Sequence, residues 1–527
     1  MIMKKIFRIY LLPALMVLSV SSCQKNFESF TKNSNVATAV PASLLFNGVL
    51  NSMVDFPDGA DEIWCQYYIY NYNYYGNNTY AFGPGDNYFN TLKNVISMEQ
   101  QATAAGQPAL NPYSAMGKFF RAYFFSRMSL EEGDIPMTQA LQGLSNLKPK
   151  YDTQKAVMIQ CLAWLEDANS DITTLISQGT TTIAGDMYFA GSLAKWQKAV
   201  NAYRIRLLLE LSKVAADPDL NVPGQFAAII NNPTKYPLMA NSGDNLQYIF
   251  VAPSNFYPMN PNNFGQNGSR QNTSQTYIKM LTTFQDPRVF VTAEPARHLV
   301  DDLHQSPTAF NSFVGADPGE DLGQMYAEAG LNIYSFINRK HYYSTYTGEP
   351  SIQIGYAEQE FEIAEGINRG WAAGDAEVHY INGIQASWAY YSIPTTGSFT
   401  AFFYRPGSTD VTNLGNYDPF TINTDWTTYY NQAAIKYAGG ATGLTQILQQ
   451  KYLALFRHAG LESYFTYRRT GVPNFTTGPG TANGGRIAWR FQYPGSERTA
   501  NTTNYNAALQ SQYAGNDDIN GVMWILK

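Results

Sequence analysis

Apolar residues recur at three- and four-residue steps along several parts of the chain, which is the spacing of one face of an α-helix. Asp152 is placed to cap the start of one such helix, and its apolar stripe consists of Met158, Cys161, Leu162, Leu165, Ala168 and Ile172. A second stripe runs over residues 193–214 and stops before Asp217-Pro218. The same spacing predicts further helices over 116–128, 352–367, 373–391 and 447–467.

Three other segments, 232–348, 395–440 and 471–527, show little sustained periodicity and are rich in Asn, Pro, Gly, Ser and Tyr. We expect long ordered loops with short helices there, and such loops usually carry function when rigid elements hold them. No exact repeat is visible, but the alternation of amphipathic helices indicates a helical-repeat architecture. The prediction is a mainly α-helical fold with a tetratricopeptide-like helix-pair scaffold and a large loop-rich region.

The amino terminus has the pattern of an export signal. Lys4, Lys5 and Arg8 precede an apolar run that Pro13 interrupts, and this run is too short to span a bilayer stably. Small residues then stand directly before Cys23, in the sequence Val-Ser-Ser-Cys, which resembles the lipobox of bacterial lipoproteins. An ordinary secretory signal that happens to end near a cysteine is the alternative interpretation.

A lipobox implies that Cys23 is acylated and becomes the first residue of the mature protein, which its acyl chains would hold on a membrane. We therefore predict a lipoprotein signal peptide over residues 1–22 and a lipidated tether over 23–40. Residues 41–527 are expected to form a single α-helical domain.

Composition narrows the class of ligand. The net charge is −6, so there is no basic excess to attract nucleic acid or anionic lipid by charge alone. Aromatic residues make up 14% of the chain and charged residues also 14%, and the charged fraction is low for a soluble protein. An aromatic-rich surface with few charges suits a neutral polar ligand. With Cys23 assigned to lipid, Cys65 and Cys161 remain, and the sequence leaves open whether they pair.

Several blocks of sequence together resemble SusD/RagB-type nutrient-binding lipoproteins, most of all their second SusD-like branch. The blocks stand in the family's order at 119–140 (FFRAYFFSRMSLEEGDIPMTQA), 149–154 (PKYDTQ), 185–188 (GDMY), 196–207 (WQKAVNAYRIRL), 356–384, 450–473 and 490–497. The chain departs from the family at Arg127–Glu132, which replace a usual Tyr before Gly133-Asp134, and at Tyr203, where Leu or Ser is common.

This resemblance implies four tetratricopeptide-like helix pairs that support a loop-rich half. It also implies a location at the outer membrane, lipid-anchored and facing the cell surface. The implied partner is a SusC-like TonB-dependent transporter, over which the lipoprotein closes as a lid. The expected function is to bind a glycan and deliver it to this transporter. A peptide ligand, as on the RagB side of the family, is the first alternative, and a secreted glycoside hydrolase is the second.

Aromatic side chains interleaved with Asn and Arg match the chemistry of a sugar, whose ring has an apolar C–H face and hydroxyl edges. The densest such loop supplies Tyr72, Tyr74 and Tyr75. In the family, the loops after the second repeat line the ligand cleft. The further candidates for ligand contact are Tyr257, Phe264, Arg270, Tyr342, Tyr343 and Tyr346. Packing of these loops against the protein itself is the alternative for all of them.

The sequence offers little support for catalysis. Glu358, Glu362 and Glu365 share one helical face, and paired carboxylates are the groups of a glycosidase, but they coincide with a family block. The histidines have no metal-binding spacing, and nucleotide-binding and nucleophile-elbow motifs are absent from the sequence. Calcium ligation by Asp58 and its neighbours at 61 and 62 is a minor alternative. We expect a binding protein without cofactor or metal.

Overall fold

The computed structural model describes residues 40–527. The predicted signal peptide, the lipidation site Cys23 and the tether up to residue 39 lie outside the described residues. Cys65 and Cys161 are both buried and free, so the structure gives no disulfide between them.

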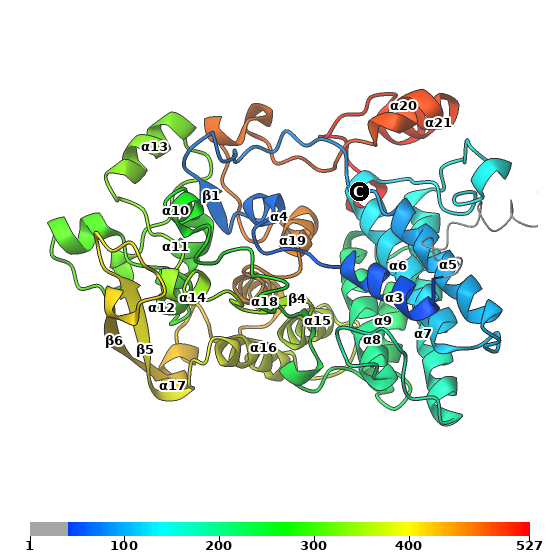
Figure 1. The fold of residues 1–527 in the computed structure, drawn as a ribbon, viewed down its shortest axis with the longest axis horizontal. Helices are drawn as coiled ribbons and strands as arrows, with labels where there is room; N and C mark the ends of the chain where they lie inside the picture. The colour runs from blue at the N-terminus through cyan, green and yellow to red at the C-terminus, as the bar shows by residue number, and fades with distance from the viewer. Residues whose placement is uncertain (1–39) are drawn as a thin grey trace, which may run out of the picture.

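Long helices gather at one end of the molecule and in its centre (Figure 1). The end group consists of α3 (Ala42–Asn51), α5 (Phe89–Ala104), α6 (Pro112–Glu132), α7 (Gln154–Ser177), α8 (Leu193–Glu210) and α9 (Val222–Asn231). The central group consists of α15 (Tyr356–Asn368), α16 (Ala376–Tyr390), α18 (Gly440–Ala454) and α19 (Glu462–Thr470). Helices pack in pairs, α3 on α5, α6 on α7 and α15 on α16, and α8 also contacts α15. This is the predicted helix-pair scaffold.

Local sequence explains where the scaffold helices begin and end. Asn111 caps α6, because its side chain accepts hydrogen bonds from the backbone N–H groups of Tyr113 and Ser114. The helix ends at Gly133, whose φ of 101° is open to glycine and strained for other residues. Thr153 caps α7, one residue later than the predicted Asp152. Asp152 instead accepts the backbone N–H groups of Met137 and Thr138 and so ties the preceding loop to the helix start.

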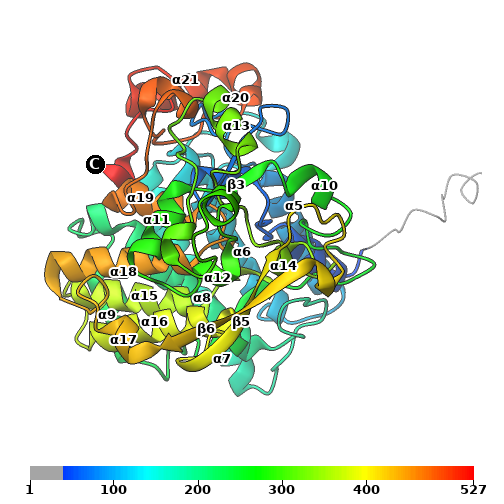
Figure 2. The same ribbon diagram turned by 90° about the vertical axis from the view of Figure 1, so that its left-hand side faces the viewer.

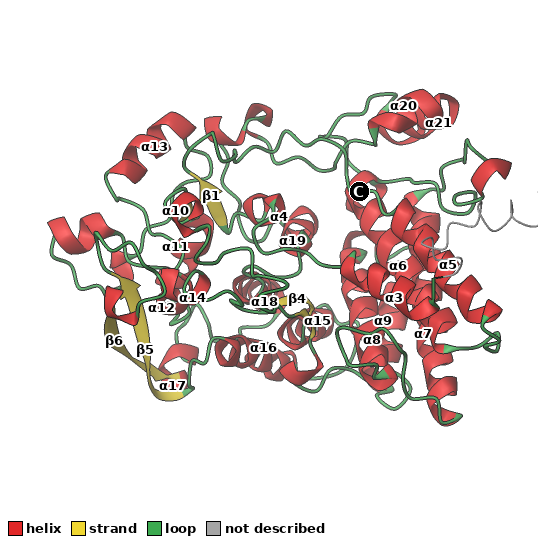
Figure 3. Ribbon diagram, viewed as in Figure 1, coloured by secondary structure: helices red, strands yellow, loops and turns green. Residues whose placement is uncertain are grey.

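The opposite end of the molecule is rich in loops (Figures 1 and 3). Its short helices are α10 (Phe264–Asn267), α11 (Gln275–Thr283), α12 (Val289–Thr292), α13 (Leu322–Gly330), α14 (Arg339–Tyr342) and α17 (Trp426–Tyr430). Figure 2 shows this end facing the viewer, with β5 and β6 crossing in front of the helices. The remaining helices are α4 (Ala60–Trp64), near the centre, and α20 (Gly495–Ala500) and α21 (Thr502–Tyr513), near the carboxyl terminus.

The described residues form three antiparallel strand pairs, and two of these pairs connect distant parts of the chain. They join β1 (Tyr68–Tyr70) to β3 (Gln271–Thr273), β2 (Leu246–Tyr248) to β4 (Ser351–Ile354), and β5 (Thr396–Tyr404) to β6 (Tyr417–Asp425). The last pair is a hairpin in register from Thr396 opposite Asp425 to Tyr404 opposite Tyr417. The sequence predicted loops for this hairpin, and it predicted one helix over 447–467 where the chain breaks between α18 and α19. Likewise, the helix predicted from residue 352 begins only after β4.

A buried network of charged side chains ties the scaffold to the centre of the molecule. The Nζ atom of Lys451 on α18 lies 2.8 Å from a carboxylate oxygen of Glu462 and 3.1 Å from one of Glu362. Arg206 on α8 donates to Glu358 on α15. These side chains are at most 7% exposed. Four helices therefore meet at one set of ion pairs.

The same network includes the helical glutamates whose sequence spacing offered a possible catalytic pair, and its contacts show what these carboxylates do. Glu358 and Glu362 are buried and paired with cations, and Glu365 is held by Arg469, 2.9 Å from Nη2 to the carboxylate. Despite burial, the charges of Arg469 and Arg369 lower the pKa of Glu365 to about 2. A glycosidase needs its carboxylates in an open cleft. These residues hold helices together, and the structure gives a substrate no access to them.

Within residues 40–527, none of the helices combines the length and the apolar character that a bilayer crossing requires.

Asp61 on α4 makes stability depend on pH. Burial raises its pKa to about 7, and the nearby carboxylates of Asp55 and Asp86 add to this effect. The unfolded value is about 3.9, so the stability contributed by Asp61 is lost as the pH rises through the folded value. We expect the stability gained by Asp61→Asn over wild type to grow by about 2–3 kcal/mol from about pH 5 to about pH 8.

Urea unfolding at both pH values measures this change. Asp167→Asn is the control, because Asp167 is exposed on α7, and its effect on stability should not vary with pH. An Asp61→Asn gain that is the same at both pH values would contradict the assigned pKa.

Candidate functional site

The pairing of β1 with β3 brings two predicted candidate loops together. Tyr70 stands opposite Gln271, and the backbone N–H of Asn71 donates to the carbonyl of Arg270 at 3.1 Å. The tyrosine loop that follows β1 therefore lies beside Arg270, although about 200 residues separate them in sequence.

Tyr72, Tyr74, Tyr75, Arg270 and Tyr326 form a surface cluster, here called the tyrosine platform. The rings of Tyr72 and Tyr326 are stacked, with centroids 5.0 Å apart and an interplanar angle of 30°. Tyr74 also stacks with Tyr72, with ring centroids 6.4 Å apart, and Tyr75 meets Tyr74 edge-on with centroids 5.2 Å apart. Tyr74 is 81% exposed and Tyr326 is 44% exposed, so the platform offers ring surface to solvent.

Arg270 lies among the platform rings. Its guanidinium carbon is 5.1 Å from the ring centroid of Tyr72, 5.9 Å from that of Tyr75 and 6.0 Å from that of Tyr326. Among the side chains that the structure describes, which exclude those of residues 266 and 267, the Arg270 guanidinium has neither a carboxylate partner nor a hydrogen bond. The planar guanidinium is therefore positioned by the rings, and its N–H donors are available to a ligand.

Buried polar contacts hold the tyrosine loop in shape. The side chain of Asn78 accepts from the backbone N–H of Tyr70 at 2.9 Å and donates to the carbonyl of Tyr70 at 2.8 Å. Asn71 donates to the side chain of Asn272 at 2.6 Å. A Cβ atom on Gly76 would lie 2.4 Å from the Tyr70 ring, so only glycine fits there without a shift. The loop is thus closed on itself before any ligand binds.

A separate small apolar cluster supports Tyr326. Met325 on α13 packs with Ile69 of β1, Ala316 and Tyr334, all of them buried. Met325 is fully buried while its neighbour Tyr326 faces outward, as the amphipathic α13 requires. The sequence prediction missed Tyr326, because it expected long loops with short helices over residues 232–348 and did not place α13 among them. The apolar spacing of Leu322, Met325 and Ala329 was the available signal.

A hollow of about 350 Å³ adjoins the platform, with Ser269, the neighbour of Arg270, in its lining. The lining also contains the predicted candidate Phe264, together with Arg339, Tyr404 and Asn332. Phe264 packs edge-on against Tyr404 with centroids 5.4 Å apart. Arg339 is held by Glu294, and its buried Nε has no partner among the described residues. The hollow offers further apolar surface and hydrogen-bond donors beside the platform.

Residues 33–494 match a second SusD-like family model, described as starch-binding and associating with the outer membrane. The chain belongs to the SusD-like family.

Solved structures agree with this assignment. The chain is 30% identical to a SusD homologue from Bacteroides fragilis, with a TM-score of 0.79 over 93% of this chain and 100% of that one. A second SusD homologue from the same species is 26% identical, with a TM-score of 0.74 over 93% and 99% of the two chains. A chitin-binding SusD homologue from Flavobacterium johnsoniae is 20% identical, covers 92% and 98%, and shares the fold at a TM-score of 0.68. Among curated proteins, none matches the chain.

The remaining predicted residues of this SusD-like protein divide between surface and core. Tyr346 is 36% exposed and pairs with Phe256, with ring centroids 4.8 Å apart, so it stays a candidate for ligand contact. Tyr257, Tyr342 and Tyr343 are at most 1% exposed. A ligand has no access to these three rings in this structure, and we therefore correct their assignment: they pack in the core.

Substitution by alanine distinguishes the core tyrosines from the platform. Tyr257→Ala is expected to lower the free energy of unfolding by about 3–5 kcal/mol, because it removes a fully buried ring that packs on Phe250. Tyr74→Ala should change it by no more than about 0.5 kcal/mol, because the ring is mostly in solvent. Denaturant unfolding of the two variants measures both values, and equal losses would contradict the assignment of Tyr257 to the core.

Proposed function

We propose that this protein binds a glycan at the outer membrane through the tyrosine platform and delivers it to a SusC-like TonB-dependent transporter. The observation that carries the proposal is the platform itself: exposed, mutually stacked rings around a guanidinium without a carboxylate partner. Aromatic faces cover the C–H side of a sugar ring, while guanidinium and amide groups meet its hydroxyls.

The family supports the class of ligand. Its description names starch binding and the outer membrane, and one relative of the same fold is described as chitin-binding. Both are polymers of neutral sugars, which agrees with a chain in which only 14% of residues are charged. None of these findings favours the peptide alternative. That the protein has no catalytic activity remains a prediction.

The proposal also includes a lipid anchor at the membrane and a transporter partner. Cys23 would carry the lipid, residues 24–40 would act as a tether, and residues 41–527 would form the binding domain on the cell surface. Labelling with a radioactive fatty acid tests the anchor, and Cys23→Ser should abolish it. Affinity purification from outer membranes of the producing cell tests the transporter.

A glycan array followed by calorimetry tests the binding function. The soluble domain should bind one class of neutral oligosaccharide, and the same sugars should be recovered intact after long incubation. Arg270→Ala should weaken this binding by about fivefold to tenfold, because the ligand loses a charge-assisted hydrogen bond. Binding to no glycan, or release of shorter products from the polymer, would overturn the proposal.

A further inference from the structure

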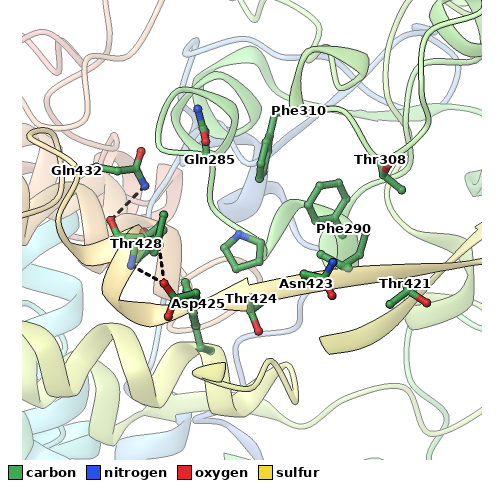
Figure 4. Close-up of a pocket in the computed structure, with 14 residues that line it drawn as sticks. Gln285, Phe290, Thr308, Phe310, Thr421, Asn423, Thr424, Asp425, Thr428 and Gln432 are labelled. Atoms are coloured by element: carbon green, nitrogen blue, oxygen red, sulfur yellow. Dashed lines mark hydrogen bonds between the residues drawn. The ribbon is translucent and has the colours of Figure 1, made fainter. Parts of the chain in front are cut away.

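A second hollow lies on the other side of the loop-rich end, between α12, β6 and α17 (Figure 4). Its volume is about 490 Å³, within the range of pockets that hold small molecules. It shares no lining residue with the tyrosine platform or with the hollow beside the platform. The chain therefore has a cavity that the proposed function does not use.

Polar side chains without protein partners line this hollow. Thr421 and Asn423 project from β6, and Gln285 follows α11 on the opposite wall (Figure 4). All three are exposed, and none makes a side-chain hydrogen bond to another described residue. Amide and hydroxyl groups that are free in this way can both donate to and accept from a ligand.

Apolar rings form another part of the wall. Phe290 and Phe310 lie beside each other above β6, with ring centroids 5.0 Å apart (Figure 4). Phe290 is buried, while Phe310 is only partly buried and so leaves ring surface on the hollow. The hollow thus combines an apolar face with hydrogen-bonding edges.

Trp388 provides an independent observation at the floor of the hollow. Its side chain is 1% exposed and packs against Trp426 and Tyr429, yet its indole Nε1 has no hydrogen-bond acceptor among residues 40–527. A buried N–H without an acceptor is costly, and buried indoles usually find a partner. The residue lines the hollow while its N–H is enclosed by protein, so the indole can report occupancy of the hollow without contacting a ligand through Nε1.

The only charged residue in the lining is already engaged. Asp425 accepts from the backbone N–H of Thr428 at 2.9 Å and from its hydroxyl, which caps α17 (Figure 4). The lining contains no Lys or Arg, so nothing in it selects an anionic ligand. Neutral, hydroxyl-rich molecules fit this set of groups best.

We propose that this hollow is a second saccharide-binding site, which takes one or two units of a neutral sugar. A sugar ring would lie with its C–H face on Phe310, and its hydroxyls would bond to Asn423, Gln285 and Thr421. Trp388 belongs to the same lining, so its indole would sense an occupied hollow. The site deepens the proposed glycan binding by adding a second point of attachment, and it rests on that function for the class of ligand.

Fluorine spectroscopy of the domain labelled with 5-fluorotryptophan tests this site directly. The Trp388 signal is assigned with Trp388→Phe and then followed during titration with glucose, N-acetylglucosamine, maltose, cellobiose and diacetylchitobiose. Titration to about 50 mM detects affinities in the millimolar range. We expect at least one of these sugars to shift the Trp388 signal in a saturable manner.

Two variants separate this site from the platform. The double variant Gln285→Ala/Asn423→Ala should lower the affinity for the sugar that shifts the Trp388 signal by about tenfold. The reason is that two hydrogen bonds are lost at exposed positions. Asn516→Ala, an exposed asparagine near the carboxyl terminus, is the matched control and should leave the affinity unchanged. Tyr74→Ala/Tyr326→Ala should also leave the Trp388 titration unchanged.

Each outcome decides the inference. If no sugar shifts the Trp388 signal, or if the shift persists with full affinity in the Gln285→Ala/Asn423→Ala variant, the second site is wrong. A shift by trialanine but by no sugar would also overturn it. If the platform variant no longer binds glycans on the array and no sugar shifts the Trp388 signal of the wild type, the proposed function stands and only the second site is refuted. If the array shows no glycan binding that depends on the platform but a sugar shifts the Trp388 signal, the proposed function is refuted and the second site stands.

Discussion

Lys451→Met is expected to lower the free energy of unfolding by about 3–5 kcal/mol. The ammonium group of Lys451 lies among the carboxylates of Glu358, Glu362 and Glu462, all of which are nearly inaccessible to water. Removal of this cation leaves Arg206 as the nearest opposite charge, so buried negative charge goes uncompensated. Because the network joins α8, α15, α18 and α19, the loss should affect the whole transition and not one helix.

Guanidinium unfolding of purified variants measures this effect. Lys436→Met is the matched control, because Lys436 is exposed and forms no ion pair with another described residue. Lys451→Met/Glu362→Gln should recover part of the loss, because it removes one of the stranded charges. Equal stability of the two single lysine variants would show that the network does not stabilise the fold.

Tyr74→Ala/Tyr326→Ala is expected to weaken glycan binding by about 100-fold, which corresponds to the loss of a central pair of aromatic contacts. Tyr326 stacks on Tyr72, and Tyr74 extends the same row of rings. A sugar chain on this row would lose two of its apolar contacts and part of the surface that orients Arg270. Calorimetry with the best oligosaccharide from the array gives both affinities.

The fold should survive this double substitution, since both rings are substantially exposed. Circular dichroism and thermal unfolding establish that the variant is folded. Leu144→Ala is the control, because Leu144 is 92% exposed in a short 3-10 helix between α6 and α7 and is not part of the platform. An unchanged affinity of the double tyrosine variant for the oligosaccharide would show that the platform does not bind the glycan.

Sequence periodicity was enough to find the scaffold but not the strands. Helices α6, α7, α8 and α16 fall where apolar residues recur with helical spacing, because burial on one face imposes that spacing. The β5–β6 hairpin was missed, because both strands keep polar residues at many positions and bury only part of one face. The break between α18 and α19 includes Arg457 and Ala459 with positive φ, a feature that no apolar pattern reveals.

The candidate site was predicted in part for similar reasons. Local composition identified the tyrosine loop, but the joining of this loop to Arg270 depends on pairing between β1 and β3, which lie far apart in sequence. A tyrosine in a polar loop looks the same in sequence whether it is buried or exposed. Tyr257 is buried because its hydroxyl finds a partner in the interior, Nε of Arg457 at 3.2 Å.

A crystal structure of the domain with a bound oligosaccharide, chosen from the glycan array, would show whether the tyrosine platform is the glycan-binding site. We expect sugar rings in contact with the faces of Tyr74 and Tyr326, with at least one hydroxyl bonded to the Arg270 guanidinium. An oligosaccharide held elsewhere at saturating concentration, with the platform rings bare, would contradict this expectation.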